Sequence, residues 1–324
     1  MKFSVVTPLW QDRPAGENME VAVNADRLGY PELWIGEMAT FDAFALATAV
    51  GSHTRQIALG IGPLAVSVRT PVTMAMGIAS VAALTGRQVA LALGASSTVV
   101  VEQWHGRPRS CTASHLDETA QIVRGLLAGD KVNFSGELAS CRGYRLRLDA
   151  VSSPLTVAAF GPAAVRVAAR RAERMLLNMV TPDSLARLRA ELAAAAAAAG
   201  KPTPQVAVWL SCAVDPAPEA IQQLLRAMVG YLAAPGYAEM FIEAGFSDLV
   251  RLARSRPHPG ELLAAMPDEL VAAVGLVGTE AAIARRLEQY RAAGADEICL
   301  VPATAGDPAG ARTLAAMARY LAGG

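Results

Sequence analysis

Short, mostly apolar runs alternate with longer amphipathic or alanine-rich segments along the whole chain. A run of this kind, bounded by turn residues, is the pattern of a parallel strand buried on both faces. Between the runs, apolar residues recur at helical spacing, as at Leu116, Ala120 and Val123, which follow the i, i+4, i+7 pattern of a core-facing stripe. The predicted strands are residues 2–8, 32–36, 57–61, 89–93, 155–159, 174–178, 206–214 and 297–302.

Eight strand-helix units without a break in composition predict an α/β fold, a single (β/α)8 TIM barrel that takes up residues 1–324 as one domain. A doubly wound sheet would have fewer strands and a Gly-x-Gly-x-x-Gly turn after the first strand, which this chain lacks. Residues 230–276 exceed one helix with its loops, so we predict a helical insertion after strand seven. Residues 132–148 predict a surface hairpin around Gly136.

Composition narrows the functional classes. Hydrophobic residues make up 53% of the 324 positions and charged residues 18%, which suits a large buried core. The formal net charge is zero, so no global field favours nucleic acid or an anionic membrane. The chain begins with a strand instead of a leader and holds no membrane-spanning apolar run, which predicts a soluble, cytoplasmic protein. Its four cysteines and four histidines show no metal-ligand spacing, and we predict no structural metal.

Two loops without bulky side chains follow neighbouring strands within residues 54–97. Small residues at the carboxyl ends of parallel strands let the backbone approach a flat ligand closely, which predicts a cofactor site. The same residues also suit the turns of an ordinary strand-loop-helix unit. The Gly62–Pro63 bond is either an ordinary trans turn or a cis peptide that bulges toward the barrel mouth. The loop residues concerned are Gly62, Pro63, Ala95, Ser96 and Ser97, and Met38 after the second strand is a further cofactor-binding candidate.

A second ligand signal lies where predicted strand 155–159 runs directly into a helix. Ala159, Phe160 and Gly161 form the turn, and Pro162 begins the helix. Free N–H groups in such a first turn, together with the helix dipole, bind phosphate. The alternative is an ordinary turn with glycine for tightness and proline to start the helix.

Further candidate residues follow the first, second and fourth strands, where barrel active-site loops lie. Glu37 is the only acid directly at a strand end in the first four units, and it is either a proton donor or an anchor that fixes its loop. We expect a mostly apolar substrate pocket, suited to a neutral, flat small molecule. Its expected lining is Trp10, Met38, Trp104 and parts of the 230–276 insertion.

Four segments, residues 32–38, 54–96, 157–178 and 276–303, resemble the bacterial luciferase-like superfamily in the expected order. The resemblance implies a TIM barrel with an insertion after strand seven, usually a homodimer or higher oligomer. It implies FMN or the deazaflavin coenzyme F-420 at the barrel mouth, over a cis-peptide bulge whose place Gly62–Pro63 occupies. Residues 157–178 resemble the family's phosphate-binding segment.

The resemblance leaves the reaction open. The sugar-phosphate dehydrogenase branch has Asp-His after strand two and glutamate after strand four, where this chain has Glu37-Met38 and Ser97. The scarcity of lysine beside arginine and alanine is typical of GC-rich genomes, such as those of actinobacteria, where F-420 is common. We therefore predict an F-420-dependent oxidoreductase that moves hydride between the deazaflavin and a small organic substrate. The alternatives are an FMN-dependent monooxygenase and a flavin-binding barrel without turnover.

Overall fold

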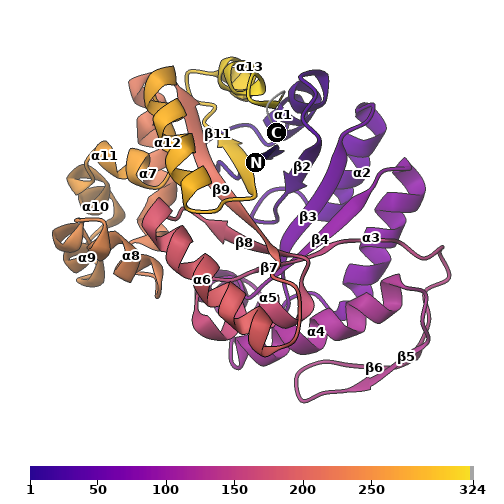
Figure 1. Ribbon diagram of the computed structural model, residues 1–324. Helices are drawn as coiled ribbons and strands as arrows, with labels where there is room; N and C mark the ends of the chain where they lie inside the picture. The colour runs from indigo at the N-terminus through magenta and orange to yellow at the C-terminus, as the bar shows by residue number, and fades with distance from the viewer. Residues whose placement is uncertain (322–324) are drawn as a thin grey trace.

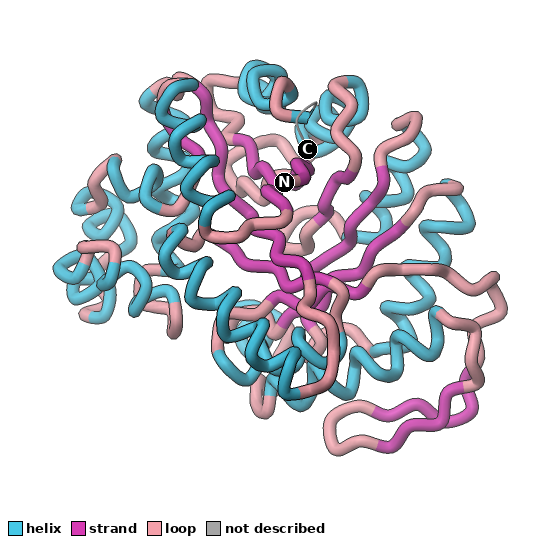
Figure 2. Tube along the Cα trace, in the orientation of Figure 1, coloured by secondary structure: helices cyan, strands magenta, loops and turns pink. Residues whose placement is uncertain are grey.

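The computed structural model describes residues 1–321, and its centre is a closed parallel sheet (Figures 1 and 2). Neighbouring strands pair in the order β9, β11, β1, β2, β3, β4, β7, β8, and the β8–β9 pairing closes the barrel. This confirms the predicted (β/α)8 fold. The barrel strands are β1 (Lys2–Val6), β2 (Glu32–Ile35), β3 (Ala58–Ala65), β4 (Val89–Gly94), β7 (Leu155–Ala158), β8 (Arg174–Asn178), β9 (Gln205–Val214) and β11 (Glu297–Pro302).

Helices surround the sheet, and several begin with recognised helix-start residues. Proline stands at the first turn of α3, α5, α6 and α7, while the Thr70 and Thr181 side chains cap α3 and α6. The surrounding helices are α1 (Glu17–Arg27), α2 (Ala43–His53), α3 (Pro71–Thr85), α4 (Thr112–Leu127), α5 (Pro162–Arg171), α6 (Pro182–Ala198), α7 (Pro218–Met228), α12 (Glu280–Ala292) and α13 (Ala311–Ala318). Among residues 1–321, no helix combines the length and apolar character needed to cross a membrane.

Two segments lie outside the repeated units. The predicted hairpin is formed by β5 (Val132–Ser135) and β6 (Ser140–Tyr144), which extend away from the barrel (Figure 1). The predicted helical insertion follows β9 and α7, and its helices cluster beside α7 in Figure 1. They are α8 (Tyr237–Glu243), α9 (Ser247–Arg254), α10 (Pro259–Ala265) and α11 (Glu269–Ala273), followed by the short strand β10 (Leu276–Gly278), which pairs with β9.

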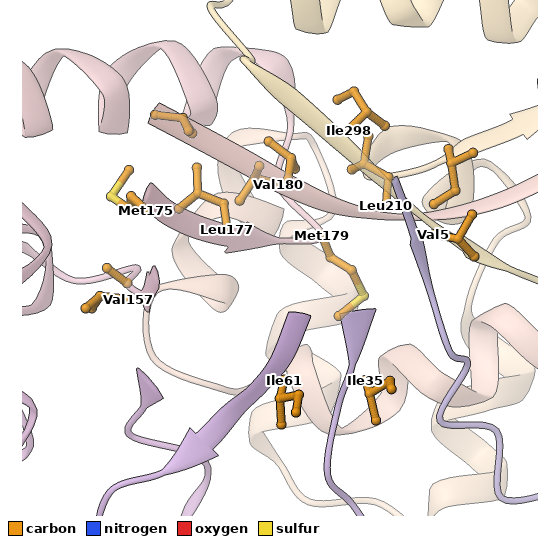
Figure 3. Packing of buried hydrophobic residues seen from close by; sticks show 14 of the residues in the cluster. Val5, Ile35, Ile61, Val157, Met175, Leu177, Met179, Val180, Leu210 and Ile298 are labelled. Atoms are coloured by element: carbon orange, nitrogen blue, oxygen red, sulfur yellow. The ribbon is translucent and has the colours of Figure 1, made fainter. Parts of the chain in front are cut away.

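The outward faces of the strands bury apolar side chains against the helices. Figure 3 shows Val5, Leu210 and Ile298, which come from the neighbouring strands β1, β9 and β11 and are fully buried. Inside the barrel, the Trp34 and Trp209 rings meet edge to face with centroids 6.2 Å apart. A Cβ at position 60 would come within 2.5 Å of the Trp34 ring, so Gly60 makes room for this indole.

The amino-terminal end of the barrel is closed by a buried ion cluster. Arg174 donates to Glu32, with Nη2 3.1 Å from Oε1, pairs with Glu297, and stands 4.6 Å from the Trp34 ring centroid. Lys2 pairs with Glu32 from the outside. Burial acts to raise the pKa of Glu32, but Arg174 and Lys2 outweigh it and hold that pKa below its ordinary value. The paired carboxylates therefore form a charged floor under the two tryptophans.

Candidate active site

A cavity of about 420 Å³ opens at the carboxyl ends of β1, β8, β9 and β11. This is the end at which ligands bind in barrels of this type. Its apolar lining includes Leu9, Trp10, Met38, Met179, Trp209 and Val301. Its polar lining includes Asp12, Asn178, Ser211, Gln223, Arg226 and Tyr231.

One face of α7 and the turn after it form a wall of the cavity. Gln223 and Ala227 are four residues apart, and Tyr231 follows after four more, so all three face the same side. Gln223 is buried, and its Oε1 accepts hydrogen bonds from two backbone N–H groups of the loop after β11, at 2.8 and 3.1 Å. This wall is therefore fixed to the barrel.

The loop after β1 is fastened across the cavity. Asp12 accepts from Gln223 Nε2 at 3.3 Å and from Arg226 Nη2 at 3.0 Å, so its two oxygens face two α7 side chains. The Trp10 indole N–H donates to the Pro302 carbonyl at 2.9 Å. The Trp10 and Asp12 side chains are thereby held in place by contacts far away in sequence.

Three aromatic rings connect the cavity wall to the turn after β7. The Tyr231 and Tyr237 rings meet edge to face with centroids 5.0 Å apart, and Phe160 stacks on Tyr237 at 4.5 Å. Asn178 stands at the end of β8 and lines the same cavity as Tyr231. Burial raises the pKa of Tyr231. Tyr231 therefore stays a neutral phenol at physiological pH.

The predicted small residues lie on the adjoining part of the rim, but Gly62 and Pro63 fall within β3, which extends past the predicted strand end at residue 61, and only Ala95, Ser96 and Ser97 lie in a loop, after β4. The Gly62–Pro63 peptide is cis, and β3 continues beyond it to Ala65 with a shift of register against β4. Gly62 has φ +117°, a conformation that L side chains rarely adopt, and a Cβ there would lie 2.3 Å from the Ala92 carbonyl oxygen. Only glycine fits at this position.

The loop after β4 carries small side chains and is held by local hydrogen bonds. Ser96 and Ser97 are exposed, while Ala95 is half-buried. The Ser97 hydroxyl accepts from the Val100 N–H at 3.2 Å, and Arg109 Nε donates to the Ser96 carbonyl at 2.8 Å. The loop thus presents backbone and small side chains at the rim.

The first turn of α5 is open to a ligand. Gly161 precedes Pro162 with extended backbone, and no side chain caps the helix. A Cβ built on Gly161 meets no atom within 4 Å, and Gly161 and Pro162 are exposed, whereas Ala159 is buried. Phe160 is held by its stacking on Tyr237. The free N–H groups of this turn and the space before them suit a phosphate.

The structure brings only part of the predicted set to the cavity. Trp10 and Met38 line it, and Tyr231 is the part of the 230–276 segment that reaches it. Trp104 does not line it, because the loop after β4 forms a π-helix, Val99–Trp104, that leaves this indole 49% exposed. The predicted cofactor residues within β3 and after β4 and β7 lie beside the cavity on consecutive strands instead of lining it.

Glu37 is engaged by a neighbour. Its carboxylate accepts from Arg69 Nε at 2.9 Å, forms a second contact with Arg69 Nη2, and accepts from the Ala43 N–H at 3.3 Å. Arg69 also pairs with Asp42, the N-cap residue of α2. This two-pronged contact occupies both oxygens of the carboxylate, and Glu37 does not line the cavity. The geometry favours the loop-anchor alternative over the proton donor.

Sequence reasoning missed the α7 wall. Gln223, Arg226 and Tyr231 carry no motif, and nothing local shows that one face of their helix turns toward the barrel mouth. A usable signal was present in Gln223, because a polar residue at a core-facing helical position requires partners. Among residues 1–321, no group of three or more His, Cys, Asp or Glu side chains is arranged to hold a metal ion.

Comparison with known proteins assigns the chain to a family. Residues 1–297 match the luciferase-like monooxygenase family, and the chain belongs to that family. It is 25% identical to a putative coenzyme F-420-dependent oxidoreductase of Mycobacterium tuberculosis, over 98% of this chain and 99% of the relative. The family's members are oxidoreductases and monooxygenases, and this protein is an enzyme of that kind.

Solved structures share its fold. The coenzyme F-420-dependent tetrahydromethanopterin reductase from Methanopyrus kandleri superposes with a TM-score of 0.85 at 17% identity, covering 100% of this chain and 99% of that one. The oxygenating constituent of 3,6-diketocamphane monooxygenase of Pseudomonas putida, in complex with FMN, superposes with a TM-score of 0.73 at 19% identity, covering 100% and 98%.

Proposed function

We propose that this enzyme is an F-420-dependent oxidoreductase that reduces a small, neutral organic molecule in the cavity at the barrel mouth. The observation that carries the proposal is the open first turn of α5, on the same rim as the Gly62–Pro63 bulge of β3 and the small-residue loop after β4. When bound, a reduced deazaflavin supplies hydride, and the protein binds, orients and protonates.

The rim residues fit such a cofactor. The N–H groups after Gly161 and Pro162 would hold a phosphate, with Ala159 and Phe160 supporting the turn. The ring would lie near Met38, over the Gly62–Pro63 bulge and the backbone of Ala95, Ser96 and Ser97, where no long side chain obstructs it.

The cavity supplies the substrate site. Trp10, Met38 and Trp209 offer apolar and aromatic surface, while polar side chains gather on the α7 side. This division suits a flat molecule with one polar end. The preference for F-420 over FMN is supported by the relative that matches almost the whole chain and is a putative F-420-dependent enzyme. The homo-oligomeric state implied by the resemblance stays a prediction.

Equilibrium titration of the purified, cofactor-free protein with F-420 and, separately, with FMN tests the choice of cofactor. We expect F-420 to bind and to support reduction of acceptors from a panel of enones, imines and quinones, followed by the absorbance of F-420. Tight FMN binding without F-420 binding would contradict the proposal and favour an FMN-dependent monooxygenase.

A further inference from the structure

Reduction of an acceptor in the cavity requires a proton as well as a hydride, and few lining groups carry an acidic one. The Asp12 carboxylate is paired with Arg226 and Gln223. The Thr7 hydroxyl already donates to the Trp34 carbonyl at 3.2 Å. Amides and the Ser211 hydroxyl are much weaker acids than a phenol, and an arginine keeps its proton. Tyr231 is the remaining lining residue with an acidic proton to donate.

The position of Tyr231 is fixed from two sides. It ends the short helical turn Val229–Tyr231, directly after α7, on the face that lines the cavity. Tyr237 packs against its ring, with centroids 5.0 Å apart, and Asn178 lines the same cavity. Tyr231 itself is only partly buried. A ligand in the cavity therefore meets a phenol whose orientation is already set.

We propose, building on the function proposed above, that Tyr231 is the proton donor of the reaction and that its acceptors are carbonyl compounds. Hydride addition to a carbonyl carbon breaks the C=O π bond and leaves its electron pair on the oxygen. The Tyr231 O–H bond then breaks, and its proton forms the product hydroxyl. The phenolate that remains takes a proton from water that enters through the cavity opening.

The surroundings of Tyr231 suit this role better than those of Glu37. Burial raises the pKa of Tyr231, so the phenol holds its proton until negative charge develops on the acceptor. Glu37 is occupied by Arg69 and by a backbone N–H, away from the cavity. The same hydrogen bond from Tyr231 polarises a carbonyl before hydride arrives, which favours an acceptor with an oxygen at its reactive end.

Tyr231→Phe removes the hydroxyl and keeps the ring. Tyr237→Phe is the matched control, because it removes the same phenolic hydroxyl from a ring that packs against Tyr231 but does not line the cavity. With F-420 and a carbonyl acceptor, we expect Tyr231→Phe to lower kcat by about 10²-fold or more, and Tyr237→Phe by less than about threefold. Thermal melting of both variants checks that the fold persists.

A second measurement needs no cofactor. The infrared carbonyl stretch of cyclohexanone, added at saturating concentration to the cofactor-free protein, reports a hydrogen bond to its oxygen. We expect a shift to lower wavenumber with the native protein and with Tyr237→Phe, and loss of that shift with Tyr231→Phe. A stretch that is the same in both variants, or no shift with the native protein, overturns the assignment of Tyr231.

The two measurements separate this inference from the proposed function. Native turnover with F-420 that survives Tyr231→Phe overturns the inference and leaves the proposed function standing. A Tyr231-dependent infrared shift without turnover of any carbonyl by F-420 supports the Tyr231 contact and contradicts the proposed function.

Discussion

The two halves of the barrel rim present different chemistry. From β3 through β4 to β7, the rim offers backbone groups, glycines and small side chains, with an uncapped helix start. From β8 through β9 and β11 to β1, it offers long aromatic and polar side chains tied to one another across the cavity. A backbone surface suits the parts that all molecules of one cofactor class share, whereas side chains select among substrates. Under the proposed function, the backbone half would hold the cofactor and the side-chain half would hold the substrate.

The largest effect that we expect on the backbone half comes from Gly62→Ala. The added Cβ would meet the Ala92 carbonyl oxygen at 2.3 Å, and the φ of +117° is unfavourable for alanine. Urea unfolding should show a loss of about 3 kcal/mol in the free energy of unfolding. Gly16→Ala is the control, because its φ is −61° and no atom lies within 4 Å of the new Cβ. Equal stability of the two variants would show that position 62 tolerates a side chain.

A smaller effect, on binding alone, is expected from Gly161→Asp. The position is open and precedes the helix, so aspartate there should cap α5 and leave the fold intact or slightly more stable. The negative charge opposes a phosphate, and F-420 affinity measured by fluorescence titration should fall at least about tenfold, roughly 1.4 kcal/mol. Gly161→Asn introduces a side chain of the same size without the charge, and it should reduce the F-420 affinity less. Undiminished affinity with Gly161→Asp would place the phosphate elsewhere.

The smallest effect on turnover is expected from Glu37→Gln. Glutamine keeps the shape of the side chain but weakens the pair with Arg69. As a loop anchor, Glu37 should be replaceable with less than about a threefold change in kcat, since only loss of a general acid costs about 10²–10⁴-fold. A hundredfold decrease in steady-state kcat, with F-420 binding intact, would restore Glu37 as the proton donor.

The barrel could be predicted from the sequence because each strand carries its own apolar run. All eight predicted strands form, and the insertion and the hairpin lie where chain length and turn residues indicated. The π-helix Val99–Trp104 was not predicted, because it lacks a distinct periodic signal, and it turns Trp104 away from the cavity.

In the candidate site, too, residues with local sequence signals could be predicted, whereas residues brought together by the fold could not. Glycines and prolines at strand ends act locally, so the backbone half of the rim was visible as the runs around Gly62 and Gly161. Gln223 gains its role from partners more than 50 residues away, Asp12 and Thr304. No window of sequence contains both members of those pairs.

The charged floor made by Arg174, Glu32 and Glu297 has a kinetic consequence. It closes the barrel below the tryptophan pair, so molecules that reach the lumen enter and leave by the rim alone. In the proposed reaction, a substrate that accepts hydride must lie against the cofactor ring and would block the exit of the ring through this entrance. We therefore expect the cofactor to bind first and leave last, with a compulsory-order pattern in product inhibition instead of a random one.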